Sequence, residues 1–276
     1  MILNSFLHLP SVGRKKESEL WAKGVLDWEK FLLVEQKSPT YDKFAKGIQD
    51  SILALKNRDH RYFSESLPTA EHWRLFREFA DNTAYIDIET TGLSPDFSEI
   101  TTIALYDGKE IKTWSKSMGF LRFRNEIAKY DLLVTFNGKG FDIPFIEKYF
   151  DIELRQSHID LRYVLASLGY SGGLKACERA LGLSREELEG VDGSMAVHLW
   201  YEHQKGKRSA LDTLLAYNIE DTVNLEHLMH FAYNQKVISL NFSNFILPIP
   251  KRPEIPFEVD IKLIERLKKK YFSNVI

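Results

Sequence analysis

Apolar residues in the first 80 positions recur at a spacing that is typical of amphipathic helices. The turn-forming run Pro10-Ser11-Val12-Gly13 precedes one such helix, which we expect to end at Gly24. Two further helices are predicted over residues 41–56 and 69–80, and Pro68-Thr69 is a start signal for the second of them. The pattern therefore predicts a small helical region at this end of the chain.

From Ala84 the pattern changes to short apolar runs that alternate with longer amphipathic segments. The short runs predict five strands, over Tyr85–Glu89, Ile100–Tyr106, Lys109–Ser115, Asp131–Phe136 and His158–Leu161. Asp107-Gly108 is a strong turn signal between the second and third strands, so we expect the first three strands to form an antiparallel unit. The amphipathic segments predict helices over Phe120–Lys129, from near Ile143-Pro144, and over residues 173–181, 193–204 and 209–234. Strands that alternate with helices after an antiparallel start indicate an α/β fold with a mixed sheet flanked by helices.

The remainder of the chain is rich in proline and then helical. Four closely spaced prolines argue against a helix or a central strand: Pro248, Pro250, Pro253 and Pro256. A helix is predicted after them, over Glu258–Phe272. We therefore divide the chain into an N-terminal helical region at residues 1–81, a main domain at 82–235, and a proline-rich segment with a C-terminal helix at 236–276 that packs on the main domain.

Composition narrows the class of protein. With 44% hydrophobic and 28% charged residues, the chain can bury a sizeable core and is not of a disordered type. The formal net charge of −2 gives no global attraction for nucleic acid, so binding of a polyanion must come from local basic patches or from metal ions. The single Cys177 excludes an internal disulfide framework. Without an apolar run of membrane-spanning length or a signal-peptide pattern, we expect a cytoplasmic protein with no membrane partner.

Two carboxylates lie near the end of the first predicted strand. Because side chains two residues apart point to the same side of a strand, Asp87 and Glu89 should project together. Like charges at the end of a core strand are costly unless a cation lies between them, and oxygen ligands favour Mg²⁺ or Mn²⁺. Acids that simply face water are the alternative, so the metal interpretation depends on partners elsewhere in the chain.

Two later segments supply such partners. The run Asn137-Gly138-Lys139-Gly140-Phe141-Asp142 follows the fourth predicted strand, where ligands gather in open α/β sheets. Asp142 could cap the following helix or face a ligand, and the glycines beside Lys139 allow the backbone to approach a ligand closely. In the last long predicted helix, Tyr217 and Asp221 are spaced i, i+4 and share one face.

Taken in order, these motifs resemble those of the DEDD exonuclease superfamily, the proofreading-type nucleases of RNase H-like, or DnaQ-like, fold. The three matching motifs are Asp87-x-Glu89, Asn137-x-x-x-Phe141-Asp142 and Tyr217-x-x-x-Asp221, and the tyrosine marks the DEDDy subgroup. The match covers about residues 82–235. The N-terminal hairpin and the run Gly190-Val191-Asp192-Gly193 further resemble the YprB-like RNase H-like proteins.

The resemblance implies a metal-dependent 3′–5′ exonuclease that hydrolyses phosphodiester bonds at the 3′ end of a nucleic acid. Its four acids would hold two divalent ions, Mg²⁺ or Mn²⁺, that activate water and stabilise the entering and leaving oxygens: Asp87, Glu89, Asp142 and Asp221. Tyr217 would orient the attacking water. Four residues are the expected substrate contacts: Thr90, Asn137, Lys139 and Phe141. Near the same edge, Asp160 is expected to support the site and His158 to be structural, and neither is expected to bind metal.

Basic residues near the N-terminus are candidates for phosphate contact. Residues 6–32 resemble a helix-hairpin-helix element, in which hairpin N–H groups bind phosphate, although Ser11 replaces the usual first glycine. Three basic residues would flank this hairpin: Arg14, Lys15 and Lys16. The alternative is a helical cap that only packs, and the two interpretations are compatible. Seven further basic residues are possible phosphate contacts: Lys139, Arg162, Lys175, Arg179, Lys205, Lys207 and Arg208.

The sequence leaves the substrate open. We favour DNA, but a metal site recognises phosphate, and no residue can be identified that would contact a 2′-hydroxyl. One alternative is an RNA-directed exonuclease, and another is a nucleic-acid-binding module with little turnover. The presence of all four carboxylates together with Tyr217 favours catalysis.

Overall fold

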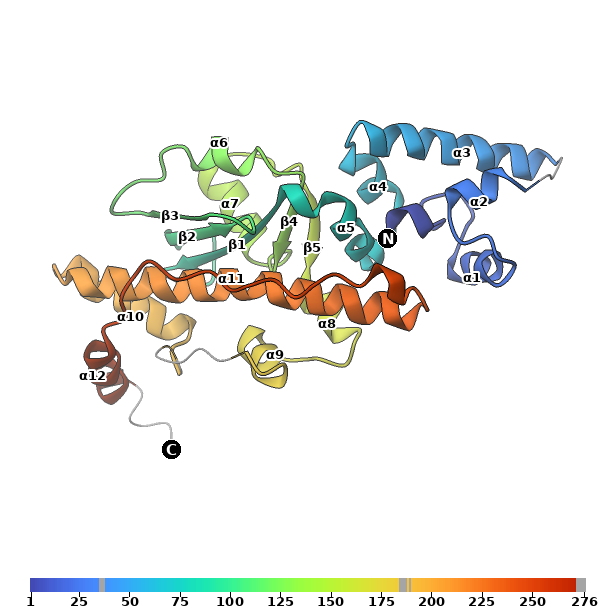
Figure 1. Cartoon of the computed structure of the whole chain (residues 1–276). Coiled ribbons are helices and arrows are strands. Elements are labelled where there is room, and N and C mark those ends of the chain that lie inside the picture. The colour runs from blue at the N-terminus through green and yellow to red at the C-terminus, as the bar shows by residue number, and fades with distance from the viewer. Residues whose placement is uncertain (35–37, 184–187, 189, 272–276) are drawn as a thin grey trace.

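A five-stranded mixed sheet forms the centre of the molecule, which we describe from a computed structural model covering residues 1–34, 38–183, 188 and 190–271 (Figure 1). The strand order is β3-β2-β1-β4-β5. The strands are β1 (Thr83–Thr90), β2 (Ile100–Tyr106), β3 (Ile111–Ser115), β4 (Leu132–Thr135) and β5 (Ser157–Asp160). β1 pairs antiparallel with β2, which pairs antiparallel with β3, whereas β1, β4 and β5 are parallel. The mixed sheet and its antiparallel start are therefore confirmed.

Helices cover both faces of the sheet. The long helix α11 (Arg208–Ser239) lies across one face, and α6 (Phe123–Ile127) and α7 (Asp142–Phe150) cover the other (Figure 1). The alternation of side chains along β1 divides the core accordingly. Ile86 and Ile88 pack in the cluster that contains residues of α6 and α7, whereas Tyr85 packs in the cluster that contains residues of α11. The alternate positions Asp87 and Glu89 therefore belong to the face that α11 covers.

The N-terminal region is helical, as expected, but differs in detail. Its elements are η1 (Ile2–Asn4), α1 (Arg14–Ala22), α2 (Trp28–Leu32), α3 (Pro39–Lys56), α4 (His60–Ser66), η2 (Thr69–Leu75), α5 (Phe76–Phe79) and η3 (Ala80–Asn82). The helix predicted over residues 69–80 is mostly 3₁₀, and α4 was not predicted. In a 3₁₀ helix, residues three apart eclipse one another, which aligns Glu71 with Arg74; their ion pair is 2.7 Å long.

A buried ion-pair network holds α1 against η2. Arg74 donates to Glu17 of α1 at 3.0 Å and to Glu71 at 2.7 Å, and all three side chains are at most 5% exposed. Glu17 also accepts hydrogen bonds from the Ser5 hydroxyl and from the Phe6 N–H. Charges this deeply buried are tolerated only when paired, so the network ties the first residues to the segment that leads into β1.

After β5 the chain forms α8 (Leu161–Ala166), α9 (Leu174–Ala180), α10 (Gly193–Gln204), α11, η5 (Ser243–Phe245) and α12 (Ile261–Tyr271). The segment between α11 and α12 runs back along α11 (Figure 1), and Asn234 of α11 holds it through two hydrogen bonds with the Leu247 backbone. Among the residues that the structure describes, none of the helices is both long and apolar enough to cross a membrane.

Several predicted helix boundaries were wrong for local reasons. The helix predicted over Phe120–Lys129 is limited to α6, because Arg122 takes the left-handed φ of 72° directly before it. The C-terminal helix was predicted to begin at Glu258, but α12 begins three residues later, at Ile261. Asp260 caps it there, because its side chain accepts a hydrogen bond from the Leu263 N–H. Its predicted end at Phe272 lies outside the described residues. The unpredicted α8 begins where the Asp160 side chain accepts from the Arg162 N–H.

Candidate active site

Three carboxylates lie close together where β1 packs against α11. One oxygen each of Asp87, Glu89 and Asp221 lies within 4.8 Å of the others. Asp87 and Glu89 project together because they are two residues apart on β1, as expected from the sequence. The pairing of β1 with β2 shifts register between Glu89 and Thr90, so a bulge lies directly beside the acids, a common feature next to active sites.

Asp221 reaches this group from the buried middle of α11. Most of the stretch from Ala210 to Met229 is inaccessible to solvent, because α11 lies between the sheet on one side and α8, α9 and α10 on the other. Asp221 is itself only 6% exposed. A carboxylate in such a position requires polar or cationic surroundings, so its placement opposite two further acids indicates a cation site.

Asp142 lies at the start of α7, buried beside the other acids. Its Oδ1 accepts a hydrogen bond from the backbone N–H of Ile88, which stands between Asp87 and Glu89 on β1. Phe141 occupies the N-cap position and no side chain caps α7, so the capping role considered from the sequence was wrong. Asp142 is not within the 4.8 Å group, but the Ile88 contact places its carboxylate directly next to that group.

The pKa values of Asp87 and Asp142 are raised by burial and by the charges of neighbouring acids. Burial raises the pKa of Asp87 well above its usual range, and the charges of Asp142, Asp221 and Glu89 raise it further. Burial is also the main cause that raises the pKa of Asp142 to about 7, against the hydrogen bond from Ile88. Four carboxylates this close together supply the oxygen ligands that a hard divalent cation such as Mg²⁺ or Mn²⁺ prefers, and the charge of such a cation would relieve their repulsion.

Tyr217 is buried one helical turn before Asp221, and its hydroxyl accepts a hydrogen bond from Lys175 Nζ at 3.0 Å. The same ammonium lies 4.6 Å from the centre of the Tyr217 ring and also donates to the backbone carbonyl of Val191. Lys175 had been considered only as a phosphate contact. The structure instead places it at the tyrosine hydroxyl, near the start of α9, which packs against α11.

Asn218 is a site residue that was not singled out from the sequence. Its Nδ2 donates to Asp87 Oδ2 at 2.7 Å, and its side chain is buried. The hydrogen bond from a neutral amide fixes the orientation of the Asp87 carboxylate without supplying a counter-charge. The available signal was an asparagine directly after Tyr217, at the end of the apolar run Leu214-Leu215-Ala216.

The loop between β4 and α7 is held in place by Asp160. Its two carboxylate oxygens accept from the backbone N–H groups of Asn137 at 2.7 Å and Lys139 at 3.1 Å. Asn137 takes a left-handed φ of 65°, and its Oδ1 accepts from Arg162 Nη1 at 2.5 Å. Asp160 therefore positions the loop that carries Asp142, which agrees with the supporting role expected for it.

The remaining residues that the sequence proposed near the site mostly contact other parts of the protein. His158 Nε2 is 2.9 Å from the Thr135 hydroxyl, and burial lowers the pKa of His158 to about 4, which agrees with a structural role. The Thr90 hydroxyl donates to the Gly92 carbonyl at 2.6 Å. The Phe141 ring packs against Phe145 with a centroid distance of 4.9 Å, and the side chain of Lys139 is exposed. A substrate contact by Thr90, Asn137, Lys139 or Phe141 stays a prediction.

The N-terminal basic residues lie away from the acids. Arg14 pairs with Glu71 at 2.5 Å, the Lys16 ammonium lies 4.2 Å from the centre of the Phe44 ring, and Lys15 is exposed. Ser11 has a φ of 64°, the left-handed conformation that glycine usually supplies at this hairpin position. The segment also packs, since Trp21 donates from Nε1 to the Asn4 carbonyl. Phosphate contact at this hairpin stays a prediction.

Comparison with known proteins gives one family match and several similar solved structures. The model of the RNase_H superfamily matches residues 84–233, which is more than half of the chain. No curated protein sequence matches. One similar solved structure is the family B DNA polymerase of the hyperthermophilic archaeon Pyrobaculum calidifontis, at 16% identity and a TM-score of 0.43. It covers 61% of this chain and 26% of the polymerase, so this chain matches about a quarter of that protein. Another is Brucella melitensis NrnC with bound Mg²⁺, at 14% identity and a TM-score of 0.41, covering 61% of this chain and 80% of NrnC.

The sheet order, the long helix across one face and the family match lead to one assignment. The match begins at Ala84 in β1 and ends at Tyr233 in α11, so it contains all four acids and Tyr217. With its five-stranded mixed sheet flanked by helices, this chain belongs to the RNase_H superfamily.

Proposed function

We propose that this protein is a metal-dependent 3′–5′ exonuclease of the DEDDy subgroup, close to the YprB-like proteins, which hydrolyses phosphodiester bonds of nucleic acid. The observation that carries the proposal is the meeting of Asp87, Glu89 and Asp221 within 4.8 Å, with Asp142 beside them. The 3′–5′ direction and the subgroup rest on the resemblance of the three motifs. DNA is the favoured substrate, and the proposed location is the cytoplasm.

The four acids are the residues that would hold divalent ions, Mg²⁺ or Mn²⁺. Their carboxylate oxygens are enough for two such ions. When bound, such ions lower the pKa of water and neutralise charge that develops on phosphodiester oxygens. The chain's own part is to hold the carboxylates in place. Asn218 orients Asp87, and the Ile88 N–H orients Asp142.

Tyr217 and Lys175 form the second part of the site. A tyrosine hydroxyl can both donate and accept a hydrogen bond, so that of Tyr217 is suited to orient a water molecule, and bound metal ions would supply most of the activation of that water. Lys175 Nζ donates to the Tyr217 oxygen, so the tyrosine accepts in this contact and can donate its own proton to a water or to a phosphate oxygen. Lys175 thus acts as a positioning residue for Tyr217.

The test uses single- and double-stranded DNA and RNA, each labelled at the 5′ end or the 3′ end, incubated with Mg²⁺ or Mn²⁺. A 3′–5′ exonuclease converts a 5′-labelled strand into a ladder of shortening products and releases a labelled mononucleotide from a 3′-labelled strand. Asp87→Ala should abolish both signals and leave the fold intact. Asp50→Ala, which changes an exposed acid of α3, is the matched control.

Three results would contradict the proposal. Near-normal cleavage by purified Asp87→Ala would show that the nuclease is a contaminant. Binding of all the strands without any metal-dependent cleavage would favour a binding module with little turnover. Cleavage confined to RNA would keep the site chemistry and replace DNA as the favoured substrate.

A further inference from the structure

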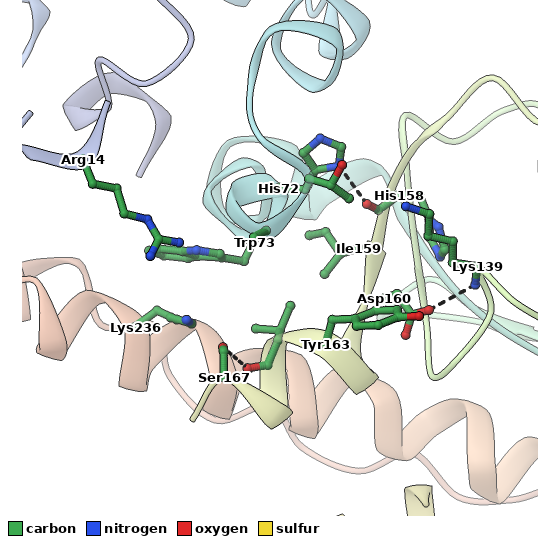
Figure 2. Close-up of a pocket in the computed structure, with 13 residues that line it drawn as sticks. Arg14, His72, Trp73, Lys139, His158, Ile159, Asp160, Tyr163, Ser167 and Lys236 are labelled. Carbon is green, nitrogen blue, oxygen red and sulfur yellow. Dashed lines mark hydrogen bonds between the residues drawn. The ribbon is translucent and has the colours of Figure 1, made fainter. Parts of the chain in front are cut away.

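A cavity of about 290 Å³ lies between the N-terminal helical region and the sheet (Figure 2). Its walls come from η2, from β5 and α8, and from the last turn of α11, so residues far apart in sequence meet there. Figure 2 shows Arg14, Trp73 and Lys236 on one side of it, and Lys139 and Asp160 on the other. A volume of this size is at the lower end of small-ligand pockets, about 300 Å³, and suits a ligand of roughly one nucleotide.

The cavity is lined by more positive than negative charge. Arg14, Lys139 and Lys236 contribute cations, whereas Asp160 is the only acid among the described residues that line the cavity. Both oxygens of Asp160 are already engaged by backbone N–H groups of the loop between β4 and α7. Glu71, which pairs with Arg14, is not part of the lining. An anion would therefore meet an excess of positive charge that no lining carboxylate neutralises directly.

Lys236 is the strongest indication of an anionic ligand. Its ammonium is half-buried, and it makes no hydrogen bond or ion pair with any residue in the ranges 1–34, 38–183, 188 and 190–271. Burial lowers the pKa of Lys236; Glu71 opposes this, and Arg14 and Arg74 lower it further. A cation in this position lacks compensation that a bound phosphate would supply.

Aromatic groups complete the lining. The Tyr163 side chain on α8 is 58% exposed, whereas Trp73 is almost fully buried and contributes only part of its surface to the wall. An accessible phenol ring beside free lysines is the combination by which proteins bind single-stranded nucleic acid: bases stack on the ring and phosphates contact the cations.

Two elements carry residues of both the cavity and the acid cluster. Lys139 is three residues before Asp142 in the loop that Asp160 holds. Lys236 follows Asp221 on the same helix by 15 residues, which corresponds to about 22 Å along the helix axis. At about 3.4 Å per stacked nucleotide, a strand of several nucleotides spans that distance.

We propose that this cavity binds one nucleotide of the substrate strand, on the 5′ side of the bond that is cut, with its two flanking phosphates at Lys139 and at Lys236, on opposite sides of the cavity, and its base against Tyr163. This inference rests on the proposed nuclease function. A free nucleoside monophosphate presents the same chemistry, so the test separates the two sources.

The test measures binding of fluorescein-labelled oligothymidylates of three and twelve nucleotides in EDTA, where no cleavage occurs, by fluorescence anisotropy across a salt series. Lys236→Gln should weaken binding of the twelve-nucleotide strand by about fivefold or more at low salt and reduce the salt slope by about 0.7, because one phosphate contact is lost. Tyr163→Ala should weaken it by at least about fivefold through lost stacking. The three-nucleotide strand can occupy the cavity but is too short to reach from it to the acids, so it should bind more weakly than the twelve-nucleotide strand and should also lose affinity in Lys236→Gln.

Control variants distinguish the loss of a positive charge from a loss of the folded structure. Lys56→Gln changes an exposed lysine in the last turn of α3 and should bind like the wild type. Lys236→Arg keeps the cation and should restore binding of the longer strand, and thermal unfolding of every variant checks that the fold is retained.

The outcomes are distinct. If Lys236→Gln and Lys56→Gln bind the longer strand equally at every salt concentration, the cavity is not on the path of the strand, while Asp87-dependent cleavage would still support the nuclease. If thymidine monophosphate binds the wild type as tightly as the long strand and loses as much affinity in Lys236→Gln, the cavity is a free-nucleotide site and the strand assignment is wrong. If the wild type neither binds nor cleaves any strand, both proposals fail.

Discussion

Tyr217 and Lys175 have a proposed role at the candidate site that differs from that of the four acids. The two side chains touch each other, 3.0 Å apart, and Tyr217 is one helical turn from Asp221. In the proposed function they orient a water, whereas the acids hold the ions. Removing either of them should therefore leave the capacity for metal intact.

We expect Tyr217→Phe to lower kcat by about 10²-fold, within the range of about 10²–10⁴ typical of positioned proton-transfer groups. Lys175→Met should also lower kcat, but by less, because Lys175 acts through Tyr217. The double variant should be no slower than Tyr217→Phe alone. Steady-state kinetics on a short labelled strand, with calorimetric Mn²⁺ titrations, measure both effects.

Lys43→Met, a change at an exposed lysine of α3, serves as the control. Losses that multiply in the double variant would show that Lys175 acts separately from Tyr217. A loss of Mn²⁺ affinity in Tyr217→Phe as large as that in Asp221→Ala would make the tyrosine a ligand, against its proposed role.

A second residue-scale effect concerns His8, which lies far from the acids in the N-terminal core. Its Nε2 is 2.8 Å from the Ser51 hydroxyl, and its ring packs against Trp28 and Phe63. Burial lowers the pKa of His8 to about 4 from 6.5, and the charge of Arg74 acts in the same direction. The imidazole is therefore buried in its neutral form.

Since the unfolded chain binds this proton below about pH 6.5 and the folded chain only near pH 4, stability should fall as the pH falls through this window. One proton corresponds to about 1.4 kcal/mol per pH unit. We expect His8→Gln to lose stability less steeply than the wild type between about pH 6 and pH 4.5. Urea unfolding at a series of pH values tests this, and parallel pH dependences would refute it.

At the scale of elements, the β4–α7 loop depends on a close contact between a glycine and the strand before it. A Cβ added to Gly138 would lie 2.2 Å from the Thr135 hydroxyl oxygen and 2.5 Å from its Cβ. At Gly140 the nearest atoms would be 3.8 Å away. Both glycines had been interpreted as allowing approach to a ligand. Gly138 instead lets the loop pack against β4, where its N–H donates to the Thr135 hydroxyl.

We expect Gly138→Ala to destabilise the fold by about 1–3 kcal/mol, the usual effect of overpacking a core. Because the loop leads directly into Asp142, its displacement should also reduce cleavage. Gly140→Ala is the matched control and should change stability by less than about 1 kcal/mol. Denaturant unfolding and cleavage assays compare the two variants, and equal effects would show that the contact with Thr135 is unimportant.

At the scale of the whole molecule, the N-terminal region and the sheet share one apolar core cluster, and the Arg74 network lies at their junction. Arg74 is 2% exposed, with Glu17 and Glu71 as partners. Removing the Arg74 cation would leave buried Glu17 without its cationic partner and Glu71 with Arg14 alone. We expect Arg74→Met to cost about 3–5 kcal/mol of unfolding free energy, the range for a broken buried ion pair.

Arg61→Met is the comparison, because the Arg61–Glu65 pair is exposed and should contribute no more than about 0.5 kcal/mol. Chemical denaturation measures both variants. Similar stability of the two would mean that the junction is held by apolar packing alone. A triple variant that also replaces Glu17 and Glu71 with leucine should be less destabilised than Arg74→Met, since it leaves no buried charge.

The local geometry of single strands, helices and turns could be predicted from the sequence. Strand period placed Asp87 and Glu89 on one side of β1, and helical period placed Tyr217 and Asp221 on one face of α11. The Asp107-Gly108 turn predicted the β2–β3 hairpin. These features depend on the backbone dihedral angles of a few neighbouring residues, which local sequence largely sets. The order of three acidic motifs then sufficed to indicate the fold.

The tertiary structure alone decided which distant side chains meet. Asn218 lies 131 positions from Asp87, and Lys175 lies 42 positions from Tyr217, yet each pair is in hydrogen-bond contact. Arg14 and Lys236 line one cavity although they are near opposite ends of the chain. Such contacts arise from the packing of α9 and α11 and of the N-terminal region on the sheet, and the spacing of residues along the chain carries no information about them. Burial acts in the same way, because desolvation of His8 or of Asp142 depends on every element packed around it.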